Sequence, residues 1–201
     1  MRMTSRQIII SLVLGRLHSV AEGKAFLKFL ADELTDINLT KLDVTEPLKR
    51  SFDLDDLEHV WQAPGVFFSG INTEGAISFT DDHYVPSVFE LTTSADFVST
   101  QQARHFLRAA AVQFDCQFGV VDRDVKRNGY SEILLSIHQL RRGIPNIYWW
   151  TVLGEPYVRL IGGEKLIHAP LWNAELIDHR IALLELTPQM SDMWERPEDV
   201  E

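Results

Sequence analysis

A chain of 201 residues with 45% hydrophobic and 24% charged residues has the composition of a globular protein and can bury the core of one domain. Its net charge of −10 argues against a nucleic-acid binder, which needs a basic face, and favours a basic protein partner.

The single cysteine, Cys116, excludes an internal disulfide and a cysteine-based zinc site, and its apolar neighbours predict a buried, inert thiol. A membrane span is not expected, because the apolar runs fall short of the roughly 20 residues that a bilayer helix needs.

The first part of the chain, residues 1–63, is predicted to be mostly helical. It contains a short apolar run over 8–14, which predicts a buried strand rather than a cleaved signal peptide. Apolar residues recur at helical spacing over 24–34, and the polar segment 36–50 with its proline predicts an irregular connection. Residues 52–61 predict a short helix that shows an acidic face to water.

Residues 64–187 are predicted to be a sheet-rich core. The apolar stretches GVFFSG and AISFT flank a turn sequence, INTEG, and predict a hairpin, which a third strand follows over 87–97. Residues 99–114 predict the clearest helix of the chain, because Ser99 and Gln102 form a capping box before a regular apolar stripe.

The chain after this helix is predicted to alternate strands and helices. The expected elements are a strand over 118–121, a helix over 131–142, a strand over 144–153, a short helix over 155–161 and a strand pair over 174–187 that turns at Asp178-His179. Residues 188–201 are expected to form an acidic, loosely held tail. Hairpins grouped around helices predict one α+β domain, 1–201, with a largely antiparallel sheet packed by two to three helices.

The sequence carries none of the common motifs of serine hydrolases, zinc proteases or nucleotide-binding loops, so we expect no enzyme activity, no cofactor and no metal site. Two short acidic stretches come closest to catalytic chemistry. The loop sequence DDHY holds His83 beside two carboxylates, and DRD places Asp122 and Asp124 after a strand, where acidic metal ligands occur in many enzymes. Solvated polar residues are the simpler interpretation of both stretches.

Acidic residues gather in the segment FDLDDLEHVW and in the polar loop that follows the predicted hairpin. The candidates for partner contact are Asp53, Asp55, Asp56, Glu58, Asp81 and Asp82. A solvated surface explains them most simply. A docking site for a cationic protein is the sharper hypothesis, because complementary charges raise association rates and select partners.

Three aromatic residues in succession, Tyr148, Trp149 and Trp150, have a core and an interface interpretation. Alternate side chains of a strand face opposite sides, so Trp149 is not expected to share a face with either neighbour. Burial in the core is the preferred interpretation, whereas an exposed ring would be an interface anchor.

The segment IYWWTVLGEPYVRLIGGEKLIHAP resembles the C-terminal signature of bacterial polymorphic-toxin immunity proteins of the Imm52-like group. That signature has an aromatic strand, a glycine, a Tyr-Val pair, an Ile/Leu-Gly pair and a turn that contains Lys-Leu. Upstream, FDCQFGVVDRDV resembles the group's segment in which a helix ends and an Asp-aromatic-Gly-Val-Val strand follows. The resemblance covers the C-terminal half only. The fold-signature positions are Tyr148, Trp149, Trp150, Gly154, Tyr157 and Gly162.

The resemblance implies a cytoplasmic antitoxin without catalytic residues, which binds a cognate toxin from a contact-dependent or type VI secretion system and blocks its active site. Under this hypothesis the acidic candidates contribute to docking, and charge reversal at Asp55 and Asp56 slows association more at low salt than at high salt. Two other classes stay open. One is an enzyme of unfamiliar type that uses Asp122, Asp124 or His83. The other is a structural or ligand-binding accessory module that self-associates, for example as a homodimer.

Overall fold

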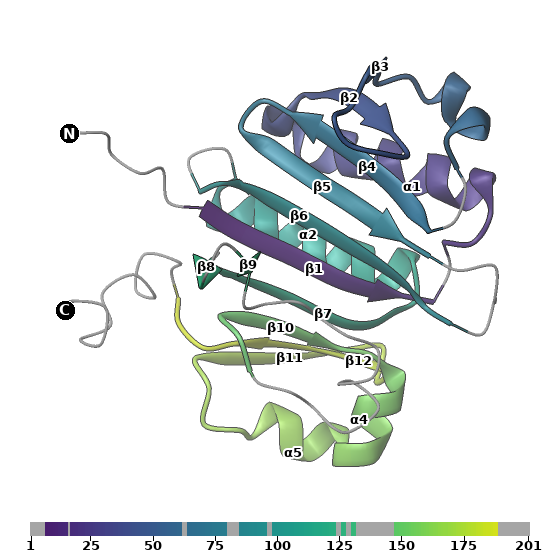
Figure 1. Cartoon of the computed structure of the whole chain (residues 1–201). Coiled ribbons are helices and arrows are strands. Elements are labelled where there is room, and N and C mark those ends of the chain that lie inside the picture. Colours follow the sequence, from purple (N-terminus) through teal and green to yellow (C-terminus); the bar gives the residue numbers. More distant parts are fainter. Residues whose placement is uncertain are drawn as a thin grey trace, which may run out of the picture.

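One antiparallel sheet dominates the fold (Figure 1). The computed structural model describes residues 7–15, 17–61, 64–79, 85–95, 98–123, 126–127, 130–131 and 147–188. Among these residues ten strands form the sheet, in the order β11-β12-β10-β7-β1-β6-β5-β4-β2-β3, and neighbouring strands are antiparallel. The predicted α+β fold with a largely antiparallel sheet is therefore confirmed.

The strands of the sheet come from nearly the whole length of the chain. They are β1 (Gln7–Leu14), β2 (Leu39–Asp43), β3 (Arg50–Ser51), β4 (Gly65–Gly70), β5 (Thr73–Ser78), β6 (Ser87–Ser94), β7 (Cys116–Arg123), β10 (Trp150–Leu153), β11 (Asn173–Ile177) and β12 (Ile181–Glu185). A separate pair is formed by β8 (Lys126–Arg127) and β9 (Tyr130–Ser131). The described helices are α1 (Val20–Glu33), α2 (Thr100–Gln113), α4 (Glu155–Ile161), α5 (Gly163–Ile167) and the short 3-10 helices η1 (Thr35–Ile37) and η2 (Asp55–His59).

The predicted strand over 8–14 is β1, and it lies in the middle of the sheet between β6 and β7. A strand in this position is buried on both faces, which explains its continuous apolar run. Ile10 and Leu12 point into the core under α1 and α2, whereas Ile9 and Val13 belong to the apolar cluster on the opposite face.

The N-terminal part differs from its predicted, mostly helical arrangement, because it also supplies β1, β2 and β3. The sequence predicts an irregular connection over 36–50, yet β2 lies within this segment and pairs with both β3 and β4. That prediction is wrong because β2 lies next to the edge of the sheet, where Thr40 and Lys41 stay exposed and hide the strand pattern.

Helices α1 and α2 lie behind the sheet in the view of Figure 1 and cover one of its faces. The capping box of Ser99 and Gln102 is formed as predicted, and Ser19 with Glu22 begins α1 in the same way. Between these helices and β6 lies a cluster of aromatic rings. Its closest ring centroids are 4.9 Å apart for Phe26–Phe89, 5.0 Å for Phe26–Phe114 and 5.2 Å for Phe29–Phe114. These contacts hold both helices on the sheet.

Helices α4 and α5 pack on the opposite face, over β7, β10 and β12. Pro156 lies in the first turn of α4 and Gly162 follows its last residue with a φ of 94°, as the sequence predicts. The hairpin of β11 and β12 is also confirmed. Three residues, Asp178 to Arg180, connect the paired Ile177 and Ile181, with positive φ at Asp178 (47°) and His179 (56°) and a hydrogen bond from the Arg180 N–H to the Ile177 carbonyl at 3.1 Å.

The aromatic segment departs from the expected strand over 144–153, because β10 begins only at Trp150. Trp149 lies in the bend before it, and its backbone N–H donates to the Asp122 carboxylate at 3.3 Å. The two tryptophan rings stack at 4.4 Å with 16° between their planes, fully buried in one core cluster. The prediction that Trp149 shares no face with its neighbours is therefore wrong for Trp150, since alternation applies only within a strand, but it holds for Tyr148, which packs against the cluster on the opposite face. Burial of this pair in the core is confirmed.

Several predictions lie outside the described residues. They concern the helix over 131–142 beyond Ser131 of β9, the tail beyond residue 188, and the side chains of Asp81, Asp82, His83 and Asp124.

Candidate functional site

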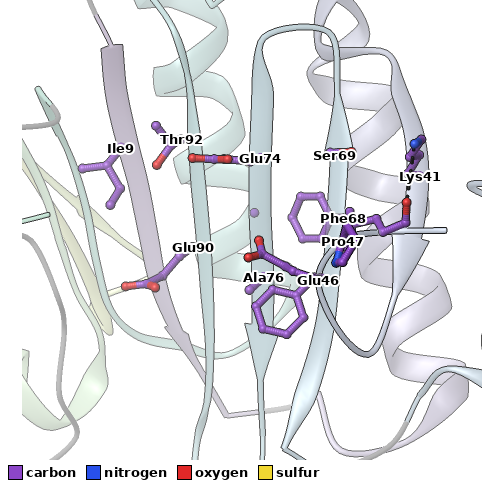
Figure 2. Close-up of a pocket in the computed structure, with 13 residues that line it drawn as sticks. Ile9, Lys41, Glu46, Pro47, Phe68, Ser69, Glu74, Ala76, Glu90 and Thr92 are labelled. Atoms are coloured by element: carbon purple, nitrogen blue, oxygen red, sulfur yellow. Dashed lines mark hydrogen bonds between the residues drawn. The ribbon is translucent and has the colours of Figure 1, made fainter. Parts of the chain in front are cut away.

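The face of the sheet opposite α1 and α2 carries a hollow of about 650 Å³, which we call the groove (Figure 2). Its floor comes from four neighbouring strands, β1, β6, β5 and β4, and its lip comes from β2 and the connection between β2 and β3. The residues used below are Ile9, Lys41, Glu46, Phe67, Glu74, Ala76 and Glu90. Within the described part of the chain, α4 and α5 cover this face only at the β10–β12 end.

Strand register explains why these side chains meet. Residues directly opposite each other in an antiparallel sheet point to the same side. One row across the sheet is Ile9, Thr92, Glu74, Ser69 and Lys41. The next row is Ser11, Glu90, Ala76, Phe67 and Asp43. The strand side chains of the groove therefore come from two adjacent rows that cross five strands.

The lip of the groove is fixed by Asp43. Its carboxylate accepts the backbone N–H of Val44 at 2.9 Å and of Lys49 at 3.1 Å, which ties together both ends of the connection that carries Glu46. These hydrogen bonds, the one from Lys49 first, hold the pKa of Asp43 below its usual value. Lys41 adds a hydrogen bond from its Nζ to the Leu48 carbonyl at 3.4 Å, drawn in Figure 2.

Among the described residues that line the groove, the charged side chains are three glutamates, Glu46, Glu74 and Glu90, and one lysine, Lys41. Glu90 differs from the other two because it is half-buried, whereas Glu46 and Glu74 are exposed. Burial raises the pKa of Glu90 above its ordinary value. Among the described residues, no side chain forms a hydrogen bond or ion pair with this carboxylate, so its desolvation is not compensated.

Glu90→Gln is expected to raise the melting temperature at pH 7. A raised folded-state pKa means that the folded protein keeps a proton that the unfolded chain releases, so stability falls as the pH rises from 4.5 through the folded pKa. The Glu90→Gln variant has no carboxylate at this position, so its stability does not fall with pH for this reason. The measurement is thermal unfolding of both proteins between pH 4 and pH 8.

Glu74→Gln is the matched control for this variant, because it removes an exposed carboxylate from the same groove. Its melting temperature should stay close to that of the wild type. A Glu90→Gln protein that is less stable than the wild type at pH 7 would show that the carboxylate has a stabilising partner.

The acidic candidates on the η2 segment do not join the groove. Asp53, Asp55, Asp56 and Glu58 are exposed, but η2 packs against α1, on the other side of the sheet. Asp55 forms an ion pair with Lys24 at 2.6 Å, and this hydrogen bond lowers the pKa of the Asp55 carboxyl. The strand carboxylates Glu74 and Glu90 do not stand out in the sequence. The sequence signal for Glu90 is the alternation of buried and less buried residues in β6, where Glu90 lies between buried Phe89 and Leu91.

The remaining chemical candidates have structural roles where the structure describes them. Cys116 is buried, its thiol contacts the Phe118 carbonyl at 3.2 Å, and burial raises its pKa to about 12. The predicted burial of the thiol is therefore confirmed, and a raised pKa disfavours the reactive thiolate form. Asp122 accepts the backbone N–H of Arg123 at 2.7 Å as well as that of Trp149. Within the described ranges, no group of three or more His, Cys, Asp or Glu side chains is placed to hold a metal ion.

The helices that the structure describes were also compared with the length and hydropathy of a bilayer span. None of them is both long enough and apolar enough to cross a membrane.

Comparison with known proteins defines what this fold is similar to. No family model matches the chain, and no curated protein matches it, so the likeness to the Imm52-like group remains a resemblance. Among solved structures, the chain is similar to the one named Pseudomonas aeruginosa T6SS protein PA0821, with a TM-score of 0.58 and 12% sequence identity. The similarity covers 92% of this chain and 69% of that one, and it shows that the two share a fold.

Proposed function

We propose that this chain is a cytoplasmic immunity protein that binds a cognate bacterial toxin and neutralises it by occlusion, without catalysis of its own. The observation that carries the proposal is the groove, an open hollow on one face of the sheet with carboxylates around an apolar floor. A protein that acts by occlusion needs such a recognition surface rather than a catalytic group.

Two likenesses support the proposal. The C-terminal signature resembles that of polymorphic-toxin immunity proteins. Its positions Trp149 and Trp150 lie at the start of β10, Gly154 connects β10 to α4, and Gly162 follows the last residue of α4. The structural neighbour is a protein of the type VI secretion system, a system that the resemblance also implies.

The charge of the chain suits a basic toxin. A net charge of −10 attracts a cationic partner over distances of about a Debye length, roughly 8 Å at physiological salt. The exposed acids of η2 would add to this long-range attraction, because such charges change the association rate and its salt dependence without lying in the groove. Apolar side chains such as Phe67, which is 36% exposed, would provide contact area after association.

The test is co-expression with the toxin encoded next to this gene. We expect wild-type protein to restore growth of cells that produce the toxin and to form a stable complex with it in size-exclusion chromatography. The control is a toxin from an unrelated system, against which the chain should give no protection. If the protein neither binds nor neutralises the neighbouring toxin, the proposal is overturned. A concentration-dependent homodimer without a tight heterologous partner would favour the accessory-module alternative instead.

A further inference from the structure

We infer that the groove receives an arginine side chain from a loop of the partner toxin, with Glu74 and Glu90 as its ion-pair partners; this inference rests on the proposed function. It moves the main contact from the predicted acidic segment at η2 to the opposite face of the sheet. Three properties of the groove support it.

The first property is charge complementarity. Glu46, Glu74 and Glu90 surround the groove in Figure 2, and Lys41, the one lysine among the described lining residues, is directed to the Leu48 carbonyl on the lip. An anionic ligand would meet three carboxylates there, whereas a cation would be attracted by all of them.

The second property is the state of Glu90. This carboxylate is half-buried and has no ion-pair or hydrogen-bond partner among the described residues. Its register neighbour on β1, Ser11, is fully buried, and its hydroxyl is likewise without a described partner. Buried polar groups normally have partners, because desolvation without compensation costs free energy. A cation that binds in the groove would supply the missing partner for Glu90.

The third property is the combination of size and apolar floor. A hollow of about 650 Å³ is far larger than a bare ion needs, and Ile9, Phe67 and Ala76 offer it no ligand atoms. An arginine side chain fits this arrangement, because its apolar stem can lie along such a floor while its charged head contacts carboxylates. The Phe67 ring can also interact with the guanidinium through its face.

The positions of the two carboxylates favour arginine over lysine. Glu74 lies on β5 opposite Thr92, and Glu90 lies on β6 opposite Ala76, so the two glutamates occupy diagonal positions on neighbouring strands. Cα atoms in such positions are roughly 7–8 Å apart, within reach of long side chains. A planar guanidinium has donors on several edges and can bind both carboxylates at once, whereas an ammonium group is a point charge.

The experiment compares two double variants that lose the same charge on opposite faces of the sheet. Glu74→Gln with Glu90→Gln changes the groove, and Asp53→Asn with Asp56→Asn changes η2. Binding of each to the product of the neighbouring toxin gene is measured by surface plasmon resonance at physiological salt. We expect the groove variant to bind at least about 30-fold more weakly, mainly through faster dissociation, because the loss of one partner of a buried charge pair has effects of this size. The η2 variant should dissociate at the wild-type rate and associate less than about 3-fold more slowly.

The outcomes separate this inference from the proposed function. If wild-type protein does not bind the toxin, both are overturned. If wild-type protein binds and the groove variant binds equally well, the inference is overturned and the proposed function stands. Misfolding is controlled by thermal unfolding, in which Glu90→Gln should not lower the melting temperature. The single change Glu74→Gln, at an exposed side chain, gives a second variant that keeps the fold and should still bind about 10-fold more weakly.

Discussion

Replacing Gly154 by alanine is expected to destabilise the protein by about 3 kcal/mol or more, the upper end of what overpacking costs. The added Cβ would lie 2.3 Å from the Cys116 carbonyl oxygen and 2.8 Å from the Gln117 Cα, and both are backbone atoms that cannot rotate away. Gly154 cannot withdraw easily either, since its N–H donates to the Gln117 carbonyl at 2.9 Å. Urea unfolding followed by circular dichroism measures the change.

Gly162→Ala is the matched control. A side chain is unfavourable at this second glycine of the signature too, but for a different reason. No atom lies within 4 Å of its Cβ position, but its φ of 94° is strained for any residue with a Cβ. We expect a loss of about 1 kcal/mol, from backbone strain alone. If Gly162→Ala were less stable than Gly154→Ala, close packing of Gly154 against β7 would not be the reason for a glycine at this position.

Trp150→Ala is expected to cost about 3–5 kcal/mol, because it leaves a large cavity in the core and removes the ring that stacks on Trp149. Trp150→Phe should cost far less. It keeps an aromatic ring against Trp149, and it removes an indole N–H that has no partner among the described residues. Trp149→Phe should be the worse of the two phenylalanine variants, since the Trp149 indole N–H donates to the Thr187 carbonyl at 3.3 Å. Chemical denaturation of the three variants measures this order, and equal losses for the two phenylalanine variants would contradict it.

Local elements could be predicted from the sequence because their signals are local. The capping box of Ser99 and Gln102, the hairpin of β4 and β5, and the turn at Asp178-His179 depend on residues a few positions apart. The order of the strands could not be predicted. It depends on which distant segments pair with β1, and hydrophobic periodicity does not specify a partner.

Most of the candidate site could not be predicted from the sequence, for the same reason. Glu74 and Glu90 share a face only through the pairing of β5 with β6, and the groove needs β1 and β2 as well. Sequence patterns instead draw attention to the acids of η2, which lie close together along the chain. Lys24, the partner of Asp55, comes from a different helix, so this ion pair could not be read from the acidic segment itself.

The central position of β1 also bears on how the chain acquires its fold during synthesis. Ile10 pairs with Leu91 on one side and with Val121 on the other, so the middle of the sheet is complete only after both distant segments have left the ribosome. Until then the run IIISLVL is an unpaired, uncharged segment of the kind that aggregates. Contacts so distant in sequence also slow the search for the native state. We therefore expect chaperones that shield the first strand to help a nascent chain of this protein to fold.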